Sequence, residues 1–368
     1  MLIDGISRQS IESNDNYKVK IIDQTLLPHE LKYITLNSFS DCCKAIKDMW
    51  VRGAPLIGVT ASYGMFFAAY ENPSKRNLNE AFKKLIATRP TAVDLKWALE
   101  NIIKLIENAP TKEKADLIWD FASKLEKESI EQCSRIGDYG LEIIESHIKN
   151  DKTINILTHC NAGWLACVDW GTALAPIYKA YNKGIDVHVW VDETRPRSQG
   201  AALTAWELSK HGVNNTLIVD NAGGHLMQNG KVDMCIVGSD RTTSSGDVCN
   251  KIGTYMKALC AYDNNIPFYV ALPESTIDFN LTSGVNKIEI EERAQEEVTL
   301  VRGINELGKI SNVKITPNFV KSHNPGFDVT PARLVTKLIT DKGVCTVSYT
   351  HLRAHETLRY LVCRLLLE

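Results

Sequence analysis

The sequence predicts an α/β protein: a mainly helical N-terminal domain with a small antiparallel sheet, followed by a domain built on a parallel sheet. Two observations lead to this prediction. Helical periodicity dominates between residues 38 and 147, and after Asn150 short β-branched runs alternate with helical segments. A chain of 368 residues can form two domains that each bury a hydrophobic core. We place these domains at residues 1–145 and 146–345, with an atypical tail at 346–368.

The composition argues against binding through charge. Lys and Arg number 42 against 44 Asp and Glu, which leaves a net charge of -2, and no long run of one sign occurs. We therefore expect no nucleic-acid partner and no membrane partner. The N-terminus has no cationic segment followed by an apolar core, so we expect a cytoplasmic protein. The ten Cys form no C-x-x-C pair, which is typical of reduced, mostly buried thiols.

The first elements are short strands followed by a helix. Residues 17–28 and 30–37 are strand-like runs that break at Pro28, which predicts a small antiparallel sheet. From Ser38 the apolar residues follow a helical period, and we expect this helix to end within residues 52–58.

Helical patterns continue through the rest of the N-terminal domain. Residues 56–70 are apolar on nearly all sides, so this helix is expected to be buried. The next three segments are amphipathic and comprise residues 79–88, 93–107 and 115–133. A continuous helix near residues 140–149 is expected to join the two domains.

The C-terminal domain begins where strands start to alternate with helices. Its expected strands are residues 154–160, 185–191, 215–220, 232–238 and 267–272. Helical segments separate these runs, which predicts a parallel sheet with helices on both faces.

Polar side chains follow four of these strands. They are Cys160 with Asn161, residues 192–195, Asp220, and Asp240 with Arg241. Because the carboxyl ends of parallel strands share one edge of a sheet, we expect a site at that edge. The stretch 237–255 is interpreted as strand, loop and helix, with Asn250 and Lys251 at the helix start and Asp247 as the helix-entry cap.

Common cofactor motifs are missing. The sequence has no G-x-G-x-x-G after its first parallel strand, no phosphate loop, no G-x-S-x-G elbow and no H-E-x-x-H helix. His351 and His355 have metal-like spacing but lie in the tail, which we exclude. We therefore expect acid–base chemistry without a cofactor or metal, with Cys160 and Asp240 as the main pair. A strand-end environment would favour a thiolate at Cys160 and a protonated acid at Asp240.

Several motifs together resemble the methylthioribose-1-phosphate isomerases, within the superfamily that includes the regulatory subunits of translation initiation factor 2B. The resemblance covers about residues 23–344. The motifs are RGAPLIGV, RPTAV, LTHCNAG, VDETRPRSQGAALTAWEL, VGSDRTTSSGDVCNKIGTY, PFYVALPESTID, IEIEER and NPGFDVTPARLVTKLITDKGV. Two departures from the family pattern are Ala202, where Arg is common, and the hydroxyl-rich residues 242–245.

The resemblance implies a Rossmann-like C-terminal domain, a homodimer, and an aldose–ketose isomerase of methionine salvage that acts on a sugar phosphate without a cofactor. It assigns Cys160 to proton or hydride movement and Asp240 to proton donation. The substrate-binding residues that it implies are Arg52, Gly53, Ala54 and Arg89 for the phosphate, and Gln199, Asn250 and Lys251 for sugar hydroxyls or phosphate oxygens.

Alternatives remain open from the sequence. Proton transfer and a direct hydride shift both fit the Cys160 and Asp240 pair. A related isomerase could act on ribose 1,5-bisphosphate or 5-deoxyribose 1-phosphate. A non-catalytic regulatory subunit of the translation-factor type is the other alternative, although such a subunit would need neither the thiol nor the acid.

Overall fold

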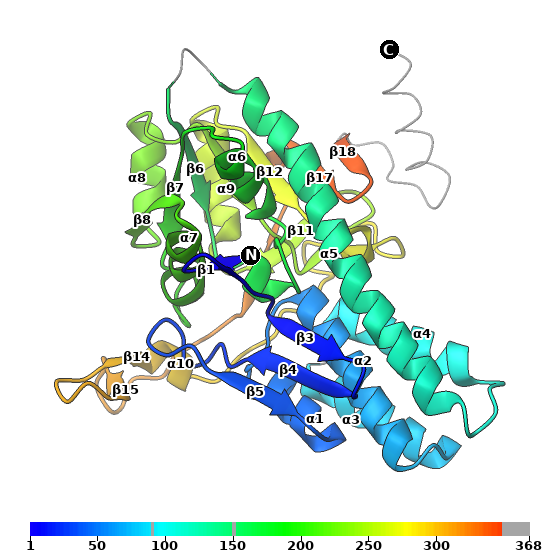
Figure 1. Cartoon of the computed structure of the whole chain (residues 1–368). Coiled ribbons are helices and arrows are strands. Elements are labelled where there is room, and N and C mark those ends of the chain that lie inside the picture. Colours follow the sequence, from blue (N-terminus) through cyan, green and yellow to red (C-terminus); the bar gives the residue numbers. More distant parts are fainter. Residues whose placement is uncertain (90–91, 149–151, 348–368) are drawn as a thin grey trace, which may run out of the picture.

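The computed structural model describes residues 1–89, 92–148 and 152–347 (Figure 1). The atypical tail expected from residue 346, with His351 and His355, lies almost wholly outside this part of the chain. The expected division near residue 145 stays a prediction. Within the described residues, no helix is both long and apolar enough to cross a bilayer.

The N-terminal region pairs a small sheet with a group of helices. Its strands are β1 (Leu2–Ile3), β2 (Ile6–Ser7), β3 (Ile11–Asn14), β4 (Lys18–Ile22) and β5 (Tyr33–Leu36), and its helices are α1 (Phe39–Lys47), α2 (Ala54–Glu71), α3 (Lys75–Thr88), α4 (Val93–Ile106) and α5 (Lys114–Ser146). Strands β3, β4 and β5 form the antiparallel sheet that the sequence predicts. Helix α1 starts where expected, because the Ser38 side chain accepts from the backbone N–H of Asp41 over 3.1 Å. It ends earlier than expected, at Lys47, and Met49 has a left-handed φ of 61°.

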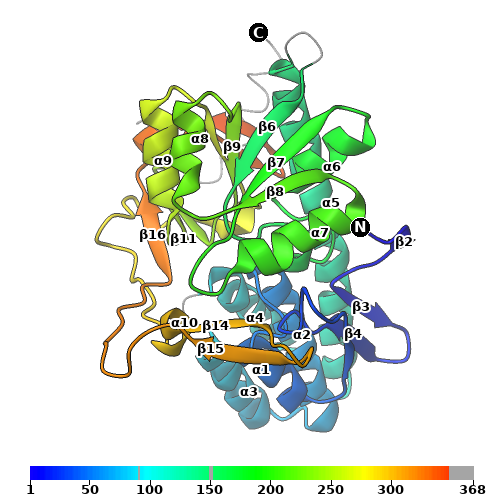
Figure 2. The same cartoon turned by 90° about the vertical axis from the view of Figure 1, so that its left-hand side faces the viewer.

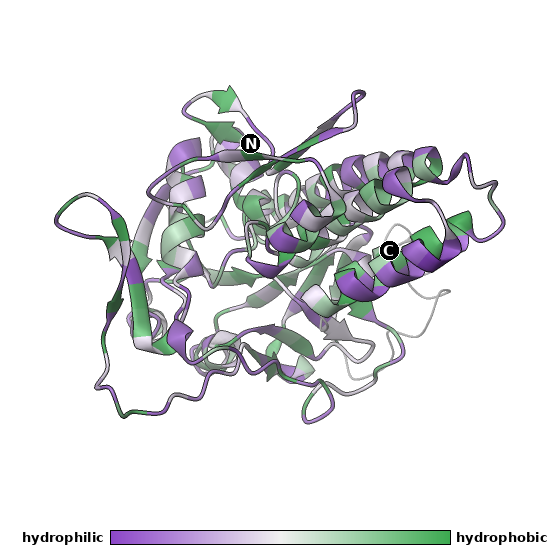
Figure 3. Cartoon of the chain, turned by 90° about the horizontal axis from the view of Figure 1, so that it is seen from below, coloured by the Kyte–Doolittle hydropathy of each residue, from purple (hydrophilic) through white to green (hydrophobic). Residues whose placement is uncertain are grey.

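Helix α2 lies at the centre of the N-terminal core. It packs against α1, α3, α4 and α5, and its residues from Leu56 to Ala69 are buried, as their apolar pattern predicts. The helices around it are amphipathic, and Figure 3 shows hydrophilic residues along the outer side of the long helices. Helix α5 runs along both parts of the molecule (Figure 1). Residues on it contact α2 and α4 at one end and α6, β17 and β18 at the other.

The C-terminal region contains a seven-stranded sheet in the order β18-β17-β12-β9-β6-β7-β8. Its strands are β6 (Ile154–Thr158), β7 (Val187–Asp192), β8 (Asn214–Ile218), β9 (Met234–Val237), β12 (Phe268–Ala271), β17 (Lys337–Thr340) and β18 (Gly343–Thr346). All neighbouring pairs are parallel except β17 and β18. The parallel sheet expected from the alternating pattern is thus confirmed, with two further strands at one edge.

Helices cover both faces of this sheet (Figure 2). They are α6 (Ala175–Asn182), α7 (Ala205–His211), α8 (Ala222–Gln228) and α9 (Thr254–Asp263), with short helical turns η1 (Trp164–Ala166) and η2 (Gly200–Thr204) before α6 and α7. The chain runs from β6 outward to β7 and β8, and then returns to β9 on the other side of β6. The strand order therefore reverses between β6 and β9, which is where open α/β sheets bind ligands.

A second sheet and a projecting hairpin complete the molecule. The sheet has the order β13-β10-β11-β16 and consists of β10 (Arg241–Thr243), β11 (Val248–Lys251), β13 (Ile277–Asp278) and β16 (Phe327–Thr330). The hairpin consists of β14 (Leu300–Ile304) and β15 (Ile310–Lys314), follows α10 (Glu296–Thr299), and projects away from the N-terminal helices (Figure 1). The remaining short turns are η3 (Glu274–Thr276) and η4 (Ala332–Leu334).

Candidate active site

Cys160 and Asp240 follow the two strands that flank the reversal of strand order. Cys160 comes two residues after β6, and Asp240 comes three residues after β9. The two strands pair directly, with Leu157 opposite Cys235. Since both strands end at the same edge, the fold brings the two side chains of the expected pair to the crevice predicted for a ligand.

Cys160 is buried, and hydrogen bonds hold both its backbone and its thiol. Its backbone N–H donates to Oγ1 of Thr194 over 2.8 Å, and its carbonyl accepts from Oγ1 of Thr204 over 2.7 Å. The thiol donates to Oε1 of Gln199 over 3.2 Å. Cys160 has a left-handed φ of 65°, which is uncommon outside glycine and is maintained here by these contacts.

The expectation of a thiolate at Cys160 is wrong for the unliganded protein. Burial raises the pKa of the Cys160 thiol, and the positive charges of Arg52 and Lys251 only partly oppose this effect. The expectation rested on a helix terminus near the thiol, whereas the thiol actually faces the Gln199 amide. The free protein therefore carries a neutral thiol at this position.

The pKa of Asp240 is shifted in the direction that a proton donor requires. Burial raises the pKa of its carboxyl, against the lowering effect of Lys251 and Arg52. Its backbone N–H donates to the carbonyl of Cys249 over 3.0 Å, which fixes it beside the second sheet. A carboxyl in this environment can hold a proton for transfer to a substrate oxygen.

Arg52 is anchored through Asn161. One guanidinium nitrogen donates to the side-chain oxygen of Asn161, and another donates to the backbone carbonyl of Asn161 over 2.9 Å. Asn161 in turn donates to Oε1 of Glu207 and, over 3.1 Å, to Oγ1 of Thr204. Burial raises the pKa of Glu207 to about 8. Glu207 was not among the residues expected from sequence, because nothing in the local helical pattern of α7 marks it as part of a site.

Gly53 and Ala54 stand at the N-terminus of α2, directly after Arg52. Gly53 has a φ of 92°, and a Cβ there would lie 2.3 Å from the carbonyl oxygen of Ala166. Only glycine fits this close approach. The unpaired N–H groups at the start of α2 suit an anion, in agreement with the phosphate role that the resemblance implies.

Arg89 brings a second positive charge, in addition to Arg52, to the start of α2. Its Nε and Nη1 are buried and have no hydrogen-bond partner among the described residues. Burial lowers the pKa of its guanidinium, while Glu291 and Asp240 oppose that shift. Arg89 lines a small cavity of about 40 Å³ together with Gly53, Ala54 and Asp240. An unsatisfied buried guanidinium is ready to pair with an anion.

Asn250 and Lys251 do not open a helix, so that expectation is wrong. Both lie on β11, which pairs with β10 and β16, and the helix begins only at Thr254. Lys251 donates through Nζ to the carbonyl of Gly326 over 2.9 Å and lies 4.4 Å from the centre of the Phe327 ring. Burial lowers the pKa of its ammonium, with Cys160 and Asp240 opposing the shift. Asn250 is buried and donates to Oγ1 of Thr254 over 3.0 Å.

Asp247 is not the entry cap of the following helix either. It sits in the turn between β10 and β11, and its carboxylate accepts from the backbone N–H groups of Gly284 and Ala332 over 2.8 and 2.9 Å. Ala332 opens the short turn η4. Asp247 therefore connects the turn between β10 and β11 to two distant segments, at Gly284 and at Ala332, and has a structural role.

Gln199 lies between the thiol and a large cavity. It directly precedes η2, as the sequence predicts, and lines a cavity of about 510 Å³. Arg52 and Ala202 line the same cavity. Six of the expected residues line one of these two cavities: Arg52 and Gln199 line the large one, and Gly53, Ala54, Arg89 and Asp240 line the small one. Cys160, Asn250 and Lys251 line neither of the two.

The comparisons with known proteins agree with this geometry. A family model described as the initiation factor 2 subunit family matches residues 50–347. A methylthioribose-1-phosphate isomerase from Paramagnetospirillum magneticum is 56% identical over 350 residues, which cover 95% of this chain and 97% of the relative. The methylthioribose-1-phosphate isomerase of Sinorhizobium medicae is 55% identical over 345 residues, covering 93% and 95%.

Two solved structures are similar over nearly the whole chain. The 5-methylthioribose 1-phosphate isomerase of Pyrococcus horikoshii is 39% identical with a TM-score of 0.81, and the match covers 98% of this chain and 96% of that one. A structure described as translation initiation factor eIF-2B, subunit delta, from A. fulgidus is also 39% identical, with a TM-score of 0.76 and coverage of 93% and 97%.

Proposed function

The chain belongs to the initiation factor 2 subunit family, and within this family we propose that it is an isomerase that converts 5-methylthioribose 1-phosphate to 5-methylthioribulose 1-phosphate. The observation that carries this proposal is the position of Cys160 and Asp240 on the two strands that flank the reversal of strand order. Relatives that are 54–56% identical bear the name of this isomerase.

The substrate phosphate is proposed to bind at the start of α2. Arg52 is oriented there by its two hydrogen bonds to Asn161, and Gly53 and Ala54 offer backbone N–H groups. Arg89 would satisfy its unpaired guanidinium nitrogens on the phosphate oxygens. Gln199, Asn250 and Lys251 would contact the sugar hydroxyls or the phosphate.

Ring opening is the first chemical step that we propose. The anomeric oxygen of the substrate carries the phosphate, so the sugar cannot open to a free aldehyde. The protonated Asp240 gives its proton to the ring oxygen while the bond between C1 and that oxygen breaks. The raised pKa of Asp240 supports this role, because a shift in this direction favours the protonated carboxyl that the step requires.

Two routes complete the reaction. In the hydride route, hydrogen moves with its electron pair from C2 to C1, and the C2 hydroxyl gives its proton to the Asp240 carboxylate. In the proton route, a Cys160 thiolate removes the C2 proton to give an enol, the resulting thiol returns a proton to C1, and the C2 hydroxyl gives its proton to the Asp240 carboxylate. The raised pKa of Cys160 favours the hydride route, in which the neutral thiol shields and positions the reacting carbons.

Turnover of the purified protein with 5-methylthioribose 1-phosphate tests the proposal. We expect Cys160→Ser and Asp240→Asn to lose roughly 10²-fold to 10⁴-fold in kcat, the usual range for acid–base groups. Full activity in both folded variants would refute the site assignment. With C2-deuterated substrate, complete loss of the label from C1 would exclude the hydride route.

The same assay separates the other candidates. Turnover of ribose 1,5-bisphosphate or 5-deoxyribose 1-phosphate in preference to the methylthio sugar would indicate a related isomerase. No turnover of any sugar phosphate would favour a regulatory subunit, as the name of the 39% identical A. fulgidus structure suggests for that protein.

We also infer a homodimer in the cytoplasm. The cytoplasmic location is supported by the free thiols of the described cysteines, which are typical of a reducing compartment. Sedimentation equilibrium tests the oligomeric state, and a monomer at micromolar concentration would contradict it.

A further inference from the structure

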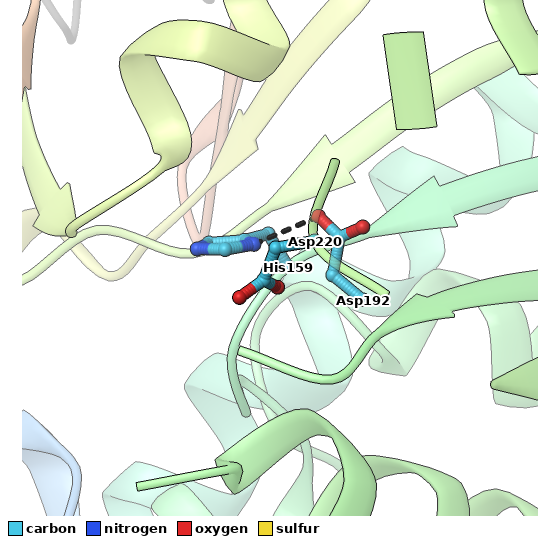
Figure 4. A group of neighbouring side chains, drawn as sticks. All are labelled: His159, Asp192 and Asp220. Atoms are coloured by element: carbon cyan, nitrogen blue, oxygen red, sulfur yellow. Dashed lines mark hydrogen bonds and ion pairs between the residues drawn. The ribbon is translucent and has the colours of Figure 1, made fainter. Parts of the chain in front are cut away.

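A buried group of charged side chains lies beneath Cys160 and has no part in the chemistry described above. Figure 4 shows His159, Asp192 and Asp220 converging at the ends of β6, β7 and β8. Lys257 of α9 completes the group, with Nζ 3.2 Å from Oδ2 of Asp192. His159, Asp192 and Lys257 are 1%, 0% and 2% exposed, so these three side chains are withdrawn from water.

The group has the composition of a metal site, but most of its ligand atoms are already engaged. The exception among the described residues is Oδ1 of Asp192, which is buried without a hydrogen-bond partner. One potential ligand atom from each of His159, Asp192 and Asp220 lies within 4.8 Å of the others. Both carboxylate oxygens of Asp220 accept backbone N–H groups, from Thr194 and Arg195, each over 2.7 Å. The Lys257 ammonium already supplies the positive charge next to Asp192. A metal ion would have to displace that ammonium, so we assign the group a different role.

Both ring nitrogens of His159 face oxygen acceptors. Nδ1 lies 2.8 Å from Oδ2 of Asp192, and Nε2 lies 2.8 Å from the carbonyl oxygen of Ile252. The first contact reaches the end of β7, and the second reaches the residue directly after Lys251. Through its ring, His159 thus joins the strand that leads to Cys160 with the strand that carries Asn250 and Lys251.

The surrounding contacts leave the ring little freedom. Gly253 has a φ of 101°, and a Cβ at this position would lie 3.0 Å from Cε1 of the His159 ring. Asp328 accepts from the N–H groups of Gly253 and Tyr255 over 2.7 and 3.1 Å, so it fixes the same turn from β16. Lys257 also donates to the backbone carbonyl of Asp220. The turn on which the ring rests is therefore fixed from β16, and Lys257 is fixed against the backbone of Asp220.

We propose that His159 is a positioning residue, which sets the separation between Cys160 and the Asn250–Lys251 strand, and that Asp192 and Lys257 hold its ring in place. The proposal rests on the proposed function, because that function gives Cys160 and the Asn250–Lys251 strand their roles in the isomerase. It predicts that loosening the ring displaces the reacting groups relative to each other while the phosphate contacts of Arg52 and Arg89 persist.

The test compares His159→Gln with His211→Gln. His211 is a matched control, because it is also buried in the C-terminal region and makes two hydrogen bonds, to Leu2 and Asn182, away from Cys160. We expect His159→Gln to lower kcat by roughly 10²-fold, as small misplacements of reacting groups do, with a much smaller change in KM. His211→Gln is expected to lower the Tm and leave kcat unchanged.

A second measurement does not depend on the substrate. The rate of Cys160 alkylation by iodoacetamide, followed by mass spectrometry of the Cys160 peptide, is expected to rise in His159→Gln and stay unchanged in His211→Gln. If the wild-type protein turns over no sugar phosphate, the proposed function fails while this measurement still tests the positioning role. Unchanged kcat and unchanged alkylation in folded His159→Gln would overturn the proposal.

A double variant tests the same proposal if His159→Gln does not fold. The double variant Asp192→Asn, Lys257→Met removes both buried charges together, which is less costly than leaving one unpaired. It is expected to show the same fall in kcat and the same rise in Cys160 alkylation. Wild-type values for both quantities in this variant would overturn the proposal.

Discussion

Arg52 is joined to Asn161 twice, through the side-chain oxygen and through the backbone carbonyl, the latter over 2.9 Å. This pairing links the residue before α2 to the residue after Cys160, so it ties the proposed phosphate site to the proposed thiol. Asn161 is held in its turn by Glu207. The orientation of Arg52 thus depends on a carboxyl group that does not itself touch the cavities.

The first prediction concerns Glu207. Because burial raises its pKa to about 8, the side chain is largely protonated at neutral pH, and Glu207→Gln is expected to keep stability and KM close to wild type. Glu207→Ala removes one of the two acceptors of the Asn161 amide and leaves Oγ1 of Thr204, a loss of about 0.5–1.5 kcal/mol that frees Arg52 to move. We expect a lower Tm and about a tenfold higher KM, measured by steady-state kinetics, which corresponds to about 1.4 kcal/mol. Equal KM values in the Gln and Ala variants would contradict this chain of contacts.

The second prediction concerns Arg89, whose buried guanidinium has unpaired nitrogens among the described residues. Burial of the Arg89 guanidinium costs free energy that Glu291 and Asp240 only partly offset, so an apolar side chain there should stabilise the protein, whereas losing a phosphate ligand weakens binding. Arg89→Met is therefore expected to raise the Tm and to lower kcat/KM. Inorganic phosphate should raise the Tm of the wild type more than that of the variant.

Arg76 provides the control for this experiment. It lies in the first turn of α3, the helix that Arg89 caps at its C-terminal end, and its side chain is 91% exposed. Arg76→Met is expected to change neither the phosphate effect nor kcat/KM. A lower Tm in Arg89→Met, together with an undiminished phosphate effect, would show that Arg89 serves the fold and not the ligand.

The large sheet was predictable from local patterns, and so was the place of its site. Strands β6 and β9 are short apolar runs flanked by polar residues, and Cys160 and Asp240 follow from where those runs stop. The parallel arrangement then brings both to one edge without further information. Local sequence was sufficient because each strand is defined by its own residues.

The second sheet was not predictable in the same way. Strand β11 is only four residues long, and its partner β16 lies far along the chain, with Asn250 opposite Asp328. The stretch from Arg241 to Asp247 is rich in hydroxyls and charge, so it lacks the alternation of a strand. Asn250 and Lys251 were therefore chosen as candidates but placed on the wrong element.

Glu207 and the neutral state of Cys160 escaped prediction for a related reason. Glu207 meets Asn161 across 46 positions of the chain, and the burial that raises both pKa values arises from packing between distant segments. Sequence shows which residue types are present. It does not show how deeply the folded chain withdraws them from water.

The third prediction concerns Asp94 in the first turn of α4, next to a cavity of about 30 Å³. Burial raises the pKa of its carboxyl from 3.8 to about 6. The folded state therefore binds a proton that the unfolded state releases between these values. The contribution of Asp94 to the free energy of unfolding should be greatest below pH 3.8, fall as the pH rises to about 6, and stay lower above pH 6.

Asp94→Asn removes the free-energy cost of ionising the buried Asp94 carboxyl. At pH 8 we expect the variant to be more stable by up to about 3 kcal/mol, which is the free energy that corresponds to the rise of the Asp94 pKa from 3.8 to about 6. The measurement is urea unfolding at pH 5 and pH 8, with a larger gain at the higher pH. Asp120→Asn, an exposed position on α5, is the control and should show no such difference. An equal effect of Asp94→Asn at both pH values would mean that the carboxyl stays ionised in the fold.

The last prediction concerns Gly53, which can be compared with a second glycine that also has a positive φ. Gly53 and Gly184 have φ values of 92° and 84°, but a Cβ at Gly184 meets nothing within 4 Å, whereas at Gly53 it meets the backbone of Ala166. Gly184→Ala therefore measures backbone strain alone, which costs about 1–2 kcal/mol. Gly53→Ala adds a collision that pushes α2 away from η1, so it should cost more stability and also raise KM by displacing Arg52 and the N–H groups at the start of α2. Equal losses of stability in the two variants, with KM unchanged, would show that the close approach at Gly53 is not needed for the phosphate site.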